Sequence, residues 1–300
     1  MSVSVPRLVA GLLAASLALA VAAGTARAVI ILESTWQAEG GGPGDEPDGF
    51  AAHAALAHQP QFRALIAFSN DEGEAWTSCS GTWLGNFGGA GYVLTAAHCF
   101  EPGDGANAFL YRTEGGTVHE GDQVWRHPRY NGNNEKRGGY DVALVRLDGP
   151  VTDGGPPPLL WAGDVAVGQH IVFVGYGNRG LASTGERSVF DEPDANKTAG
   201  ENVIDEVAAA TGRDHGDADS GNWMSVTLRR PGEGAGRLDG LLGSGDSGGS
   251  AWMRRGDAWY LVGVNVSGTG VTYGEQSFFL RLAGIRPWLA GLLPGLRFGP

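Results

Sequence analysis

Short apolar or β-branched segments, separated by glycine and asparagine, recur along most of the chain after Phe62. Each is four to eight residues long and is bounded by turn-forming residues, a pattern that predicts β-strands. Near the end, Pro287 predicts the start of a short helix over 288–293, which Pro294 would end. We therefore expect an all-β fold with a short C-terminal helix. The predicted strands are 64–68, 81–84, 91–95, 141–147, 170–175, 224–228, 259–266 and 278–282.

The segments between these strands predict the domain organisation. Residues 150–168 are dense in proline and glycine and indicate a linker between a first strand-rich unit, 61–149, and a second, 169–300. Residues 29–60 show little periodicity, which predicts an irregular N-terminal arm. The polar, acidic and glycine-punctuated stretch from about 178 to 240 predicts a long loop insertion within the second unit.

The first 28 residues carry the features of a secretory signal peptide. Arg7 precedes an uncharged run rich in alanine and leucine over 8–24, and Ala26-Arg27-Ala28 has the small-x-small form of a cleavage site. The alternative, an uncleaved membrane anchor, is disfavoured because the run is shorter than the roughly 20 residues that span a bilayer. We therefore expect a secreted protein, extracellular or periplasmic, with no membrane attachment after signal removal.

Composition and charge narrow the possible partners. Glycine makes up 51 of the 300 residues, which fits the many tight turns of a β-rich chain. The net charge of −12 argues against a nucleic-acid partner, because a phosphate-binding surface needs clustered Lys and Arg. The basic residues are 2 Lys and 19 Arg, a bias typical of a GC-rich genome, which suggests a bacterial source.

Cys79 and Cys99 are the only two cysteines in the chain. In an oxidising compartment such a pair favours a disulfide, which would close a loop of about 20 residues worth roughly 3 kcal/mol in the chain-entropy model. The alternative, a reactive thiol, is disfavoured because the two do not form a Cys-x-x-Cys motif.

The sequence Gly245-Asp246-Ser247-Gly248-Gly249 is the first chemical signal. It also fits the Gly-x-Ser-x-Gly motif of α/β-hydrolases, a fold that places an acid and then a histidine after the serine. The last histidine here, His215, precedes Ser247, so the α/β-hydrolase interpretation fails.

Two more motifs precede the serine, Thr95-Ala-Ala-His98-Cys99 and Asp141-Val-Ala-Leu144. The order His98, Asp141, Ser247 in these contexts resembles the chymotrypsin-like (trypsin-fold) serine peptidases, over roughly residues 60–293. The resemblance implies two packed antiparallel six-stranded β-barrels, and it identifies Cys79 and Cys99 as the disulfide of the histidine loop. Further segments that resemble the family are 79–84, 127–131, 174–177 and 261–264.

The resemblance also implies the role of each site residue. Ser247 would attack the scissile carbonyl, His98 would take its proton and pass it to the leaving amine, and Asp141 would hold the imidazole. The backbone N–H groups of Gly245 and Ser247 would form the oxyanion hole. This chemistry uses no cofactor and no metal, and the other histidines form no metal-ligand spacing. We expect a monomer that acts on proteins or peptides.

Substrate specificity is the point at which the chain departs from trypsin itself. By resemblance, Leu241 forms the base of the pocket for the side chain before the cut, and Gly268 and Ser277 form its walls. An acid at the base would select Arg or Lys, and Asp239 lies two residues off register. The resemblance therefore predicts a preference for a neutral or apolar side chain.

Activation departs from the family pattern as well. Family zymogens are cut before an Ile-Val-Gly-Gly start, and the new amino group pairs with the acid that precedes the serine, here Asp246. No such cut site is present, but signal removal would expose Val29, whose amino group could serve directly. In the alternative, residues 29–60 form a loose arm and a side chain holds Asp246.

Two other functions are compatible with the same residues. A catalytically latent homologue would bind peptides or partners on this scaffold, and an esterase would use the same machinery on another acyl group. A secreted serine endopeptidase is the function that the motifs favour.

Overall fold

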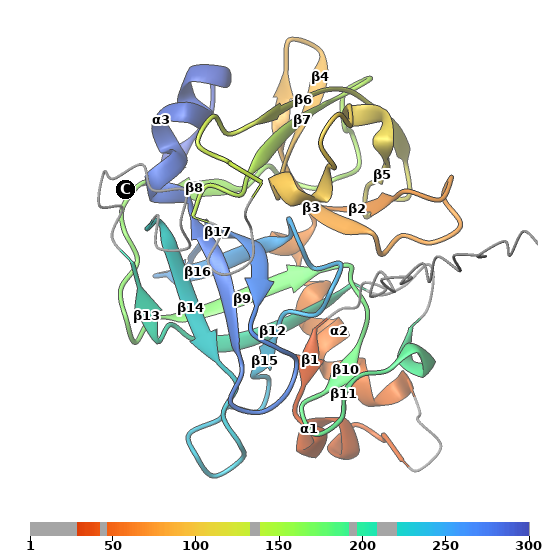
Figure 1. Cartoon of the computed structure of the whole chain (residues 1–300), viewed down its shortest axis with the longest axis vertical. Helices are drawn as coiled ribbons and strands as arrows, with labels where there is room; N and C mark the ends of the chain where they lie inside the picture. The colour runs from red at the N-terminus through yellow and green to blue at the C-terminus, as the bar shows by residue number, and fades with distance from the viewer. Residues whose placement is uncertain (1–28, 43–46, 133–138, 192–196, 209–220, 300) are drawn as a thin grey trace, which may run out of the picture.

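The computed structural model of the chain (Figure 1) describes residues 29–42, 47–132, 139–191, 197–208 and 221–299. The predicted signal peptide, 1–28, therefore lies outside the described residues. No helix within the described ranges is long and apolar enough to cross a membrane.

The first unit is a closed antiparallel barrel of six strands in the order β2-β3-β4-β7-β6-β5. Inward-facing aromatic and β-branched side chains such as Phe68, Trp83 and Val93 fill it. Two strands were not predicted, because one has only three residues and the other is mostly polar and partly exposed. The strands are β2 (Leu65–Ser69), β3 (Cys79–Phe87), β4 (Ala90–Thr95), β5 (Leu110–Arg112), β6 (Val118–Arg126) and β7 (Ala143–Leu147).

The second unit is an antiparallel sheet in the order β12-β9-β16-β17-β18-β14-β13. It curls into a half-barrel, and the amide of Asn202 on β12 bridges the open side by donating to the carbonyl of Thr227 on β14 at 3.2 Å. The all-β architecture is confirmed, although this second sheet is not a fully hydrogen-bonded barrel. Its strands are β9 (His170–Gly175), β12 (Thr198–Val203), β13 (Glu206–Val207), β14 (Trp223–Thr227), β16 (Ser250–Arg255), β17 (Ala258–Gly268) and β18 (Gln276–Arg281).

The prediction of a loop insertion over 178–240 was wrong for part of that range. Strands β12 and β13 lie in it, together with β14, which matches the predicted strand 224–228. Strand β12 is at one edge of the half-barrel sheet, and β14 and β13 are at the other. The sequence of β12 has few apolar residues because a bulky side chain of the neighbouring strand packs closely on it. A Cβ at Gly200 would lie 2.6 Å from the ring of Phe173, so the aromatic side chain covers the bare backbone.

The described residues of the N-terminal segment, 29–42 and 47–60, form short regular elements that pack on the second unit, which corrects the prediction of an irregular arm over 29–60. Strand β1 (Ile30–Ile31) pairs with β10 (Gly180–Leu181) and β15 (Gly240–Leu241), and β11 (Gly185–Glu186) completes a four-stranded sheet. Short helices follow, because the apolar side chains of this segment contribute to the core of the second unit. They are α1 (Glu33–Ala38), α2 (Ala51–Ala57) and 3-10 helices over Pro47–Phe50 and Pro60–Phe62.

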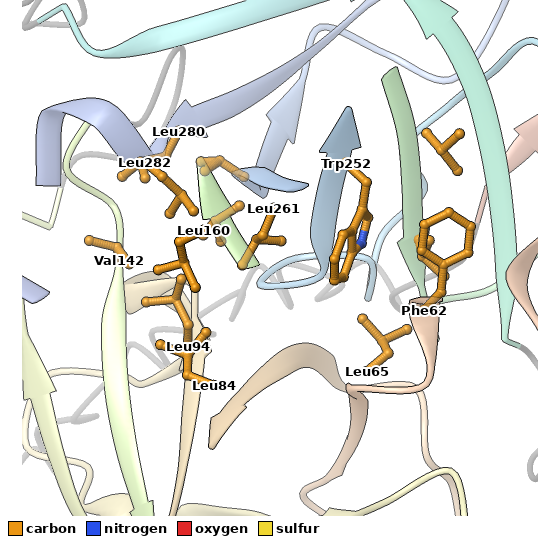
Figure 2. Close-up of a cluster of buried hydrophobic side chains, with 14 of the residues drawn as sticks. Phe62, Leu65, Leu84, Leu94, Val142, Leu160, Trp252, Leu261, Leu280 and Leu282 are labelled. Carbon is orange, nitrogen blue, oxygen red and sulfur yellow. The ribbon is translucent and has the colours of Figure 1, made fainter. Parts of the chain in front are cut away.

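The two units share a continuous apolar interface (Figure 2). Leu84, Leu94 and Val142 of the first unit face Leu160 and Leu261, the latter on β17 of the half-barrel. Burying such a side chain contributes about 1.5–3 kcal/mol. The predicted linker, 150–168, includes β8 (Leu159–Trp161), which runs parallel to β17 and to the last strand, β19 (Phe298–Gly299).

The C-terminal helix α3 (Leu282–Leu292) is longer than predicted and begins before Pro287. Its buried face is formed by Leu282, Ile285 and Leu289, at the spacing of three to four residues that one face of a helix requires. Pro287 therefore lies within the helix, where the packing of this face against the second unit compensates for one missing backbone hydrogen bond.

Candidate active site

A cleft of about 940 Å³ brings together side chains from both units. The first barrel contributes His98, and the second unit contributes the loop that carries Ser247 and part of β17. Asp141 lies behind the histidine and is 1% exposed. The three residues that the sequence motifs single out therefore meet in space.

His98 and Asp141 are held together by two hydrogen bonds. His98 lies in a 3-10 helix (Ala97–Cys99) that begins two residues after the end of β4, and Asp141 lies two residues before the start of β7, which pairs with β4. One carboxylate oxygen accepts the backbone N–H of His98 at 2.9 Å, and the other lies 2.6 Å from Nδ1 of the ring. The second contact fixes the tautomer in which Nδ1 carries the proton, leaving Nε2 as the acceptor.

Ser247 completes the chain of contacts, with its Oγ 2.8 Å from Nε2 of His98. Its loop turns sharply because Gly245 and Gly248 adopt φ of +84° and +83°. A Cβ at Gly248 would lie 2.1 Å from Oγ1 of Thr95, and one at Gly245 would lie 2.3 Å from the carbonyl of Thr77. Both positions therefore require glycine, for conformation and for space.

The charge of Asp141 tunes the base. Burial by itself would lower the pKa of His98, but the neighbouring carboxylate and its hydrogen bond outweigh that effect and raise the pKa above its usual value. The imidazole is one-fifth exposed, so solvent and substrate reach it from the cleft. The arrangement can accept a proton from the Ser247 hydroxyl and stabilise the imidazolium that results.

The backbone N–H groups of Gly245 and Ser247 lie in the same turn. Neither donates to an acceptor within the part of the chain that the structure describes. By contrast, the N–H of Gly248 donates to the backbone carbonyl of Asn265 at 2.8 Å, and that of Gly249 donates to the backbone carbonyl of Asp246 at 2.9 Å. Two neighbouring free donors in a tight turn can receive a developing oxyanion.

Ser80 and Asn265 are positioning residues that the motif analysis did not single out. The backbone N–H of Ser80 donates to the Ser247 carbonyl at 2.8 Å, and its hydroxyl donates to the Gly245 carbonyl at 2.9 Å. Asn265 on β17 donates from Nδ2 to the carbonyl of Val174 at 3.0 Å. Ser80 lies in the Cys79–Leu84 segment that resembles the family, which is the signal that could have found it.

The disulfide between Cys79 and Cys99 is present, with a Cα–Cα distance of 6.3 Å. It joins β3 to the short helix that carries His98, and both cysteines line the cleft. The covalent link therefore holds the histidine segment against the barrel.

The predicted pocket residues divide into two groups. Gly268 lines the cleft, together with Leu242, Gly243 and Val266. Leu241 does not line it, because its side chain is fully buried in the core of the second unit. Ser277 is also buried behind the wall, where its hydroxyl accepts the backbone N–H of Leu242 at 2.9 Å.

The predicted activation residues also lie in the second unit. Asp246 is fully buried and accepts the backbone N–H of Gly243 at 3.0 Å and of Gly177 at 3.3 Å. Burial dominates and raises the pKa of this carboxyl well above its usual value. Val29 is fully buried next to β1, which pairs with β15 immediately ahead of the loop that carries Asp246.

No cluster of three or more His, Cys, Asp or Glu side chains in the described ranges is arranged as a metal site. The groups that meet at Ser247 are its hydroxyl, the His98 imidazole and, behind the imidazole, the Asp141 carboxylate.

Two comparisons with known proteins identify what this chain is similar to. The family model described as Trypsin matches residues 53–223, more than half of the chain, a range that includes His98 and Asp141 and ends before Ser247. Trypsin, alkaline C, from Manduca sexta is 34% identical over 118 residues, covering 33% of this chain and 43% of that protein. The chain thus spans less than half the length of this curated relative. The extent of the family match shows that the chain belongs to the trypsin family.

Proposed function

We propose that this chain is a secreted, bacterial-type serine endopeptidase that acts as a monomer on proteins or peptides. The observation that carries the proposal is the continuous chain of contacts from Asp141 through His98 to Ser247. Export is supported by the features of residues 1–28 and by the disulfide, which persists in an oxidising compartment.

The geometry supports an acyl-enzyme mechanism. Ser247 Oγ attacks the scissile carbonyl as His98 Nε2 takes its proton, and Asp141 stabilises the imidazolium. The N–H groups of Gly245 and Ser247 stabilise the tetrahedral oxyanion, and one such donor is worth about 2.7–4 kcal/mol of barrier. The imidazolium then protonates the leaving amine. Water, activated by the same imidazole, hydrolyses the acyl-enzyme and regenerates Ser247.

We propose a preference for neutral or apolar side chains at the residue before the cut. The support comes from Leu242, Val266 and Val271, which line the cleft with the glycines 268 and 270. In this proposal Leu242, rather than the buried Leu241, forms the base of the pocket for the side chain before the cut. The test is kcat/KM for matched peptides with Leu, Phe, Tyr, Arg or Lys before the cut. Cleavage of only the Arg and Lys peptides would refute the preference.

We propose that signal removal also activates the enzyme, with the new Val29 amino group as the cation for Asp246. The support is the burial of both residues and the pairing of β1 with β15 beside the Asp246 loop. The test compares a chain that begins at Val29 with one that carries an extra glycine before it. Activity that is unchanged by the glycine would refute a direct role for Val29.

The experiment that tests the function itself is covalent labelling with a fluorophosphonate, which phosphonylates an activated serine and releases fluoride. Intact mass should show one adduct on the secreted protein and none on Ser247→Ala. The same spectrum reports whether the chain starts at Val29. A folded protein without an adduct would favour the latent homologue, and an adduct with ester but no peptide hydrolysis would favour the esterase.

A further inference from the structure

The turn that carries the Gly245 N–H can hold its central peptide in two orientations. Residues Gly243–Asp246 form this turn, which is closed by the Asp246 N–H donating to the Gly243 carbonyl at 3.3 Å. Gly245, in the third position, has a φ of +84°, the conformation of a type II turn. A type I turn has a φ of about −90° there, and it differs by roughly a half-turn of the peptide between the two central residues. Glycine adopts both values readily, so Gly245 itself does not select between the two forms.

The two orientations present different groups to the cleft. Across a trans peptide the carbonyl and the following N–H point in opposite directions. The Ser244 carbonyl accepts the backbone N–H of Asn178 at 3.4 Å, so the Gly245 N–H of the same peptide points away from Asn178. A half-turn would exchange the two groups, and the Gly245 N–H would then face a second N–H. The orientation of this one peptide therefore decides whether Gly245 can donate to an oxyanion.

Glu186 holds the residue that precedes this peptide. Its Oε1 accepts the backbone N–H of Ser244 at 3.0 Å and the Ser244 hydroxyl at 3.2 Å. Ser244 is exposed at the cleft, whereas Glu186 on β11 is half-buried. The two bonds fix the nitrogen, Cα and Cβ of Ser244. The remaining group of Ser244, its carbonyl, is the one that Asn178 holds.

The loop that carries Glu186 is itself anchored from behind. Its strands β10 and β11 form a hairpin beside β1 (Figure 1). Further along the loop, Phe190 is fully buried and packs against two aromatic rings of the N-terminal segment, Trp36 at 5.8 Å and Phe50 at 5.2 Å between ring centroids. The Glu186 carboxylate therefore reaches Ser244 from a packed platform.

We propose that Glu186 is a positioning residue of the oxyanion hole. By holding the main chain and the hydroxyl of Ser244, it keeps the turn in the form that aims the Gly245 N–H at the developing oxyanion. The inference rests on the proposed peptidase function and adds to it a residue outside every motif that the sequence analysis singled out. Glu186 is not among the residues that line the cleft, so it acts through Ser244 and Gly245.

The first test compares two substitutions of Glu186. Glu186→Ala removes the acceptor, whereas Glu186→Gln removes the charge and keeps an acceptor oxygen at the end of a side chain of the same length. Complete loss of an oxyanion donor lowers kcat by about 10²–10³. Because Glu186→Ala frees the turn without removing the donor, we expect kcat for a peptide to fall about 10-fold with KM within about 3-fold. Glu186→Gln should restore kcat to within about 3-fold of the wild type. Rates are normalised to active sites titrated to completion with the fluorophosphonate, so misfolded protein is not counted.

The second test probes the oxyanion contact with a peptide aldehyde. Ser247 Oγ bonds to the aldehyde carbon, its proton passes to His98, and the electron pair of the carbonyl double bond becomes an oxyanion in the same hole. Because this adduct resembles the transition state, its inhibition constant should rise in Glu186→Ala by the factor by which kcat/KM falls, about 10-fold. The matching peptide alcohol forms no oxyanion and should bind to both proteins equally.

Thr184→Ala is the matched control, because Thr184 is exposed in the turn between β10 and β11 of the same hairpin. It should leave kcat and the aldehyde inhibition constant unchanged. The inference alone is overturned if Glu186→Ala matches the wild type in both quantities, if it weakens the alcohol as much as the aldehyde, or if Glu186→Gln is as slow as Glu186→Ala. A wild-type protein that neither hydrolyses peptides nor forms a fluorophosphonate adduct would overturn the proposed function, and this inference with it.

Discussion

Ser80 offers a direct test of how the fold holds the catalytic turn. Its side chain is fully buried, and its hydroxyl donates to the Gly245 carbonyl at 2.9 Å while accepting the Tyr176 N–H at 2.9 Å. The substitution Ser80→Ala removes these two bonds and keeps the backbone N–H that donates to Ser247. It leaves one buried carbonyl and one buried N–H without a partner.

The expected loss follows from those two groups. A buried polar group deprived of its partner costs about 1–3 kcal/mol, so the two together predict a decrease of about 2–6 kcal/mol in the free energy of unfolding. Gly245 is also a proposed oxyanion donor, and full loss of such a donor costs about 10²–10³ in kcat. Since Ser80→Ala only loosens Gly245, we expect kcat to fall about 10- to 100-fold with KM within about 3-fold.

Ser225→Ala is the matched control. Ser225 on β14 is also fully buried, but its hydroxyl has no hydrogen-bond partner among the residues that the structure describes. Its removal should change the free energy of unfolding by less than about 1 kcal/mol and leave kcat unchanged. Urea unfolding followed by tryptophan fluorescence measures the first quantity, and initial rates normalised to fluorophosphonate-titrated sites measure the second. The reasoning fails if the two alanine variants behave alike in both assays.

Three further changes have defined outcomes. The activity kcat/KM should fall as pH decreases through a midpoint above the usual histidine value, because the raised pKa of His98 lets it protonate there; Asp141→Asn should lower that midpoint and cut kcat by about 10⁴, as a pH–rate profile would show. Cys79→Ser should lower the free energy of unfolding by about 3 kcal/mol, measured by urea unfolding. A urea unfolding curve that coincides with that of the wild type would contradict this. Glu114→Gln should cost about 3–5 kcal/mol, because it leaves the buried Lys197 ammonium without a counter-charge. Burial by itself would raise the pKa of Glu114, but the His58 hydrogen bond and the Lys197 ammonium outweigh it and lower the pKa. This stabilisation should therefore be present above the unfolded-state pKa and be lost in the wild type as pH falls through the folded-state value, which acid unfolding curves of both proteins would test.

The strands that could be predicted from the sequence are those with a clear apolar signal. Segments such as 170–175 and 259–266 match β9 and β17 closely, because both are buried along most of their length. Strand β12 escaped because Gly200 and Asn202 serve tertiary contacts, a close approach of Phe173 and an amide bridge to β14. Such contacts cannot be read from local pattern.

The candidate site divides in the same way. His98, Asp141 and Ser247 lie in local motifs, so their meeting could be predicted from order and context. The pocket base could not, because Leu241 and Leu242 are adjacent and similar, and only the backbone direction of β15 decides which one faces the cleft. That direction depends on the pairing of β1 with β15, a contact about 210 residues apart in the sequence.

The active geometry depends on the contact between the two units, since neither carries the full site. His98 and Asp141 belong to the first barrel, and Ser247 belongs to the second unit. Phe62, just before β2, packs edge-on against Trp252 of β16 at a ring distance of 5.5 Å, and its carbonyl accepts the Lys197 ammonium at 3.0 Å. These contacts and the bond from Ser80 to Ser247 cross the same interface.

A shift of the two units by one ångström would therefore separate Ser247 Oγ from His98 Nε2 before either core unfolds. Catalysis is sensitive to displacements of that size, whereas a packed core tolerates them at modest cost. Substitutions at the interface should consequently reduce activity at denaturant concentrations where the tryptophan signal of the folded state persists. The apolar interface in Figure 2 therefore positions the proposed catalytic residues as well as stabilising the fold.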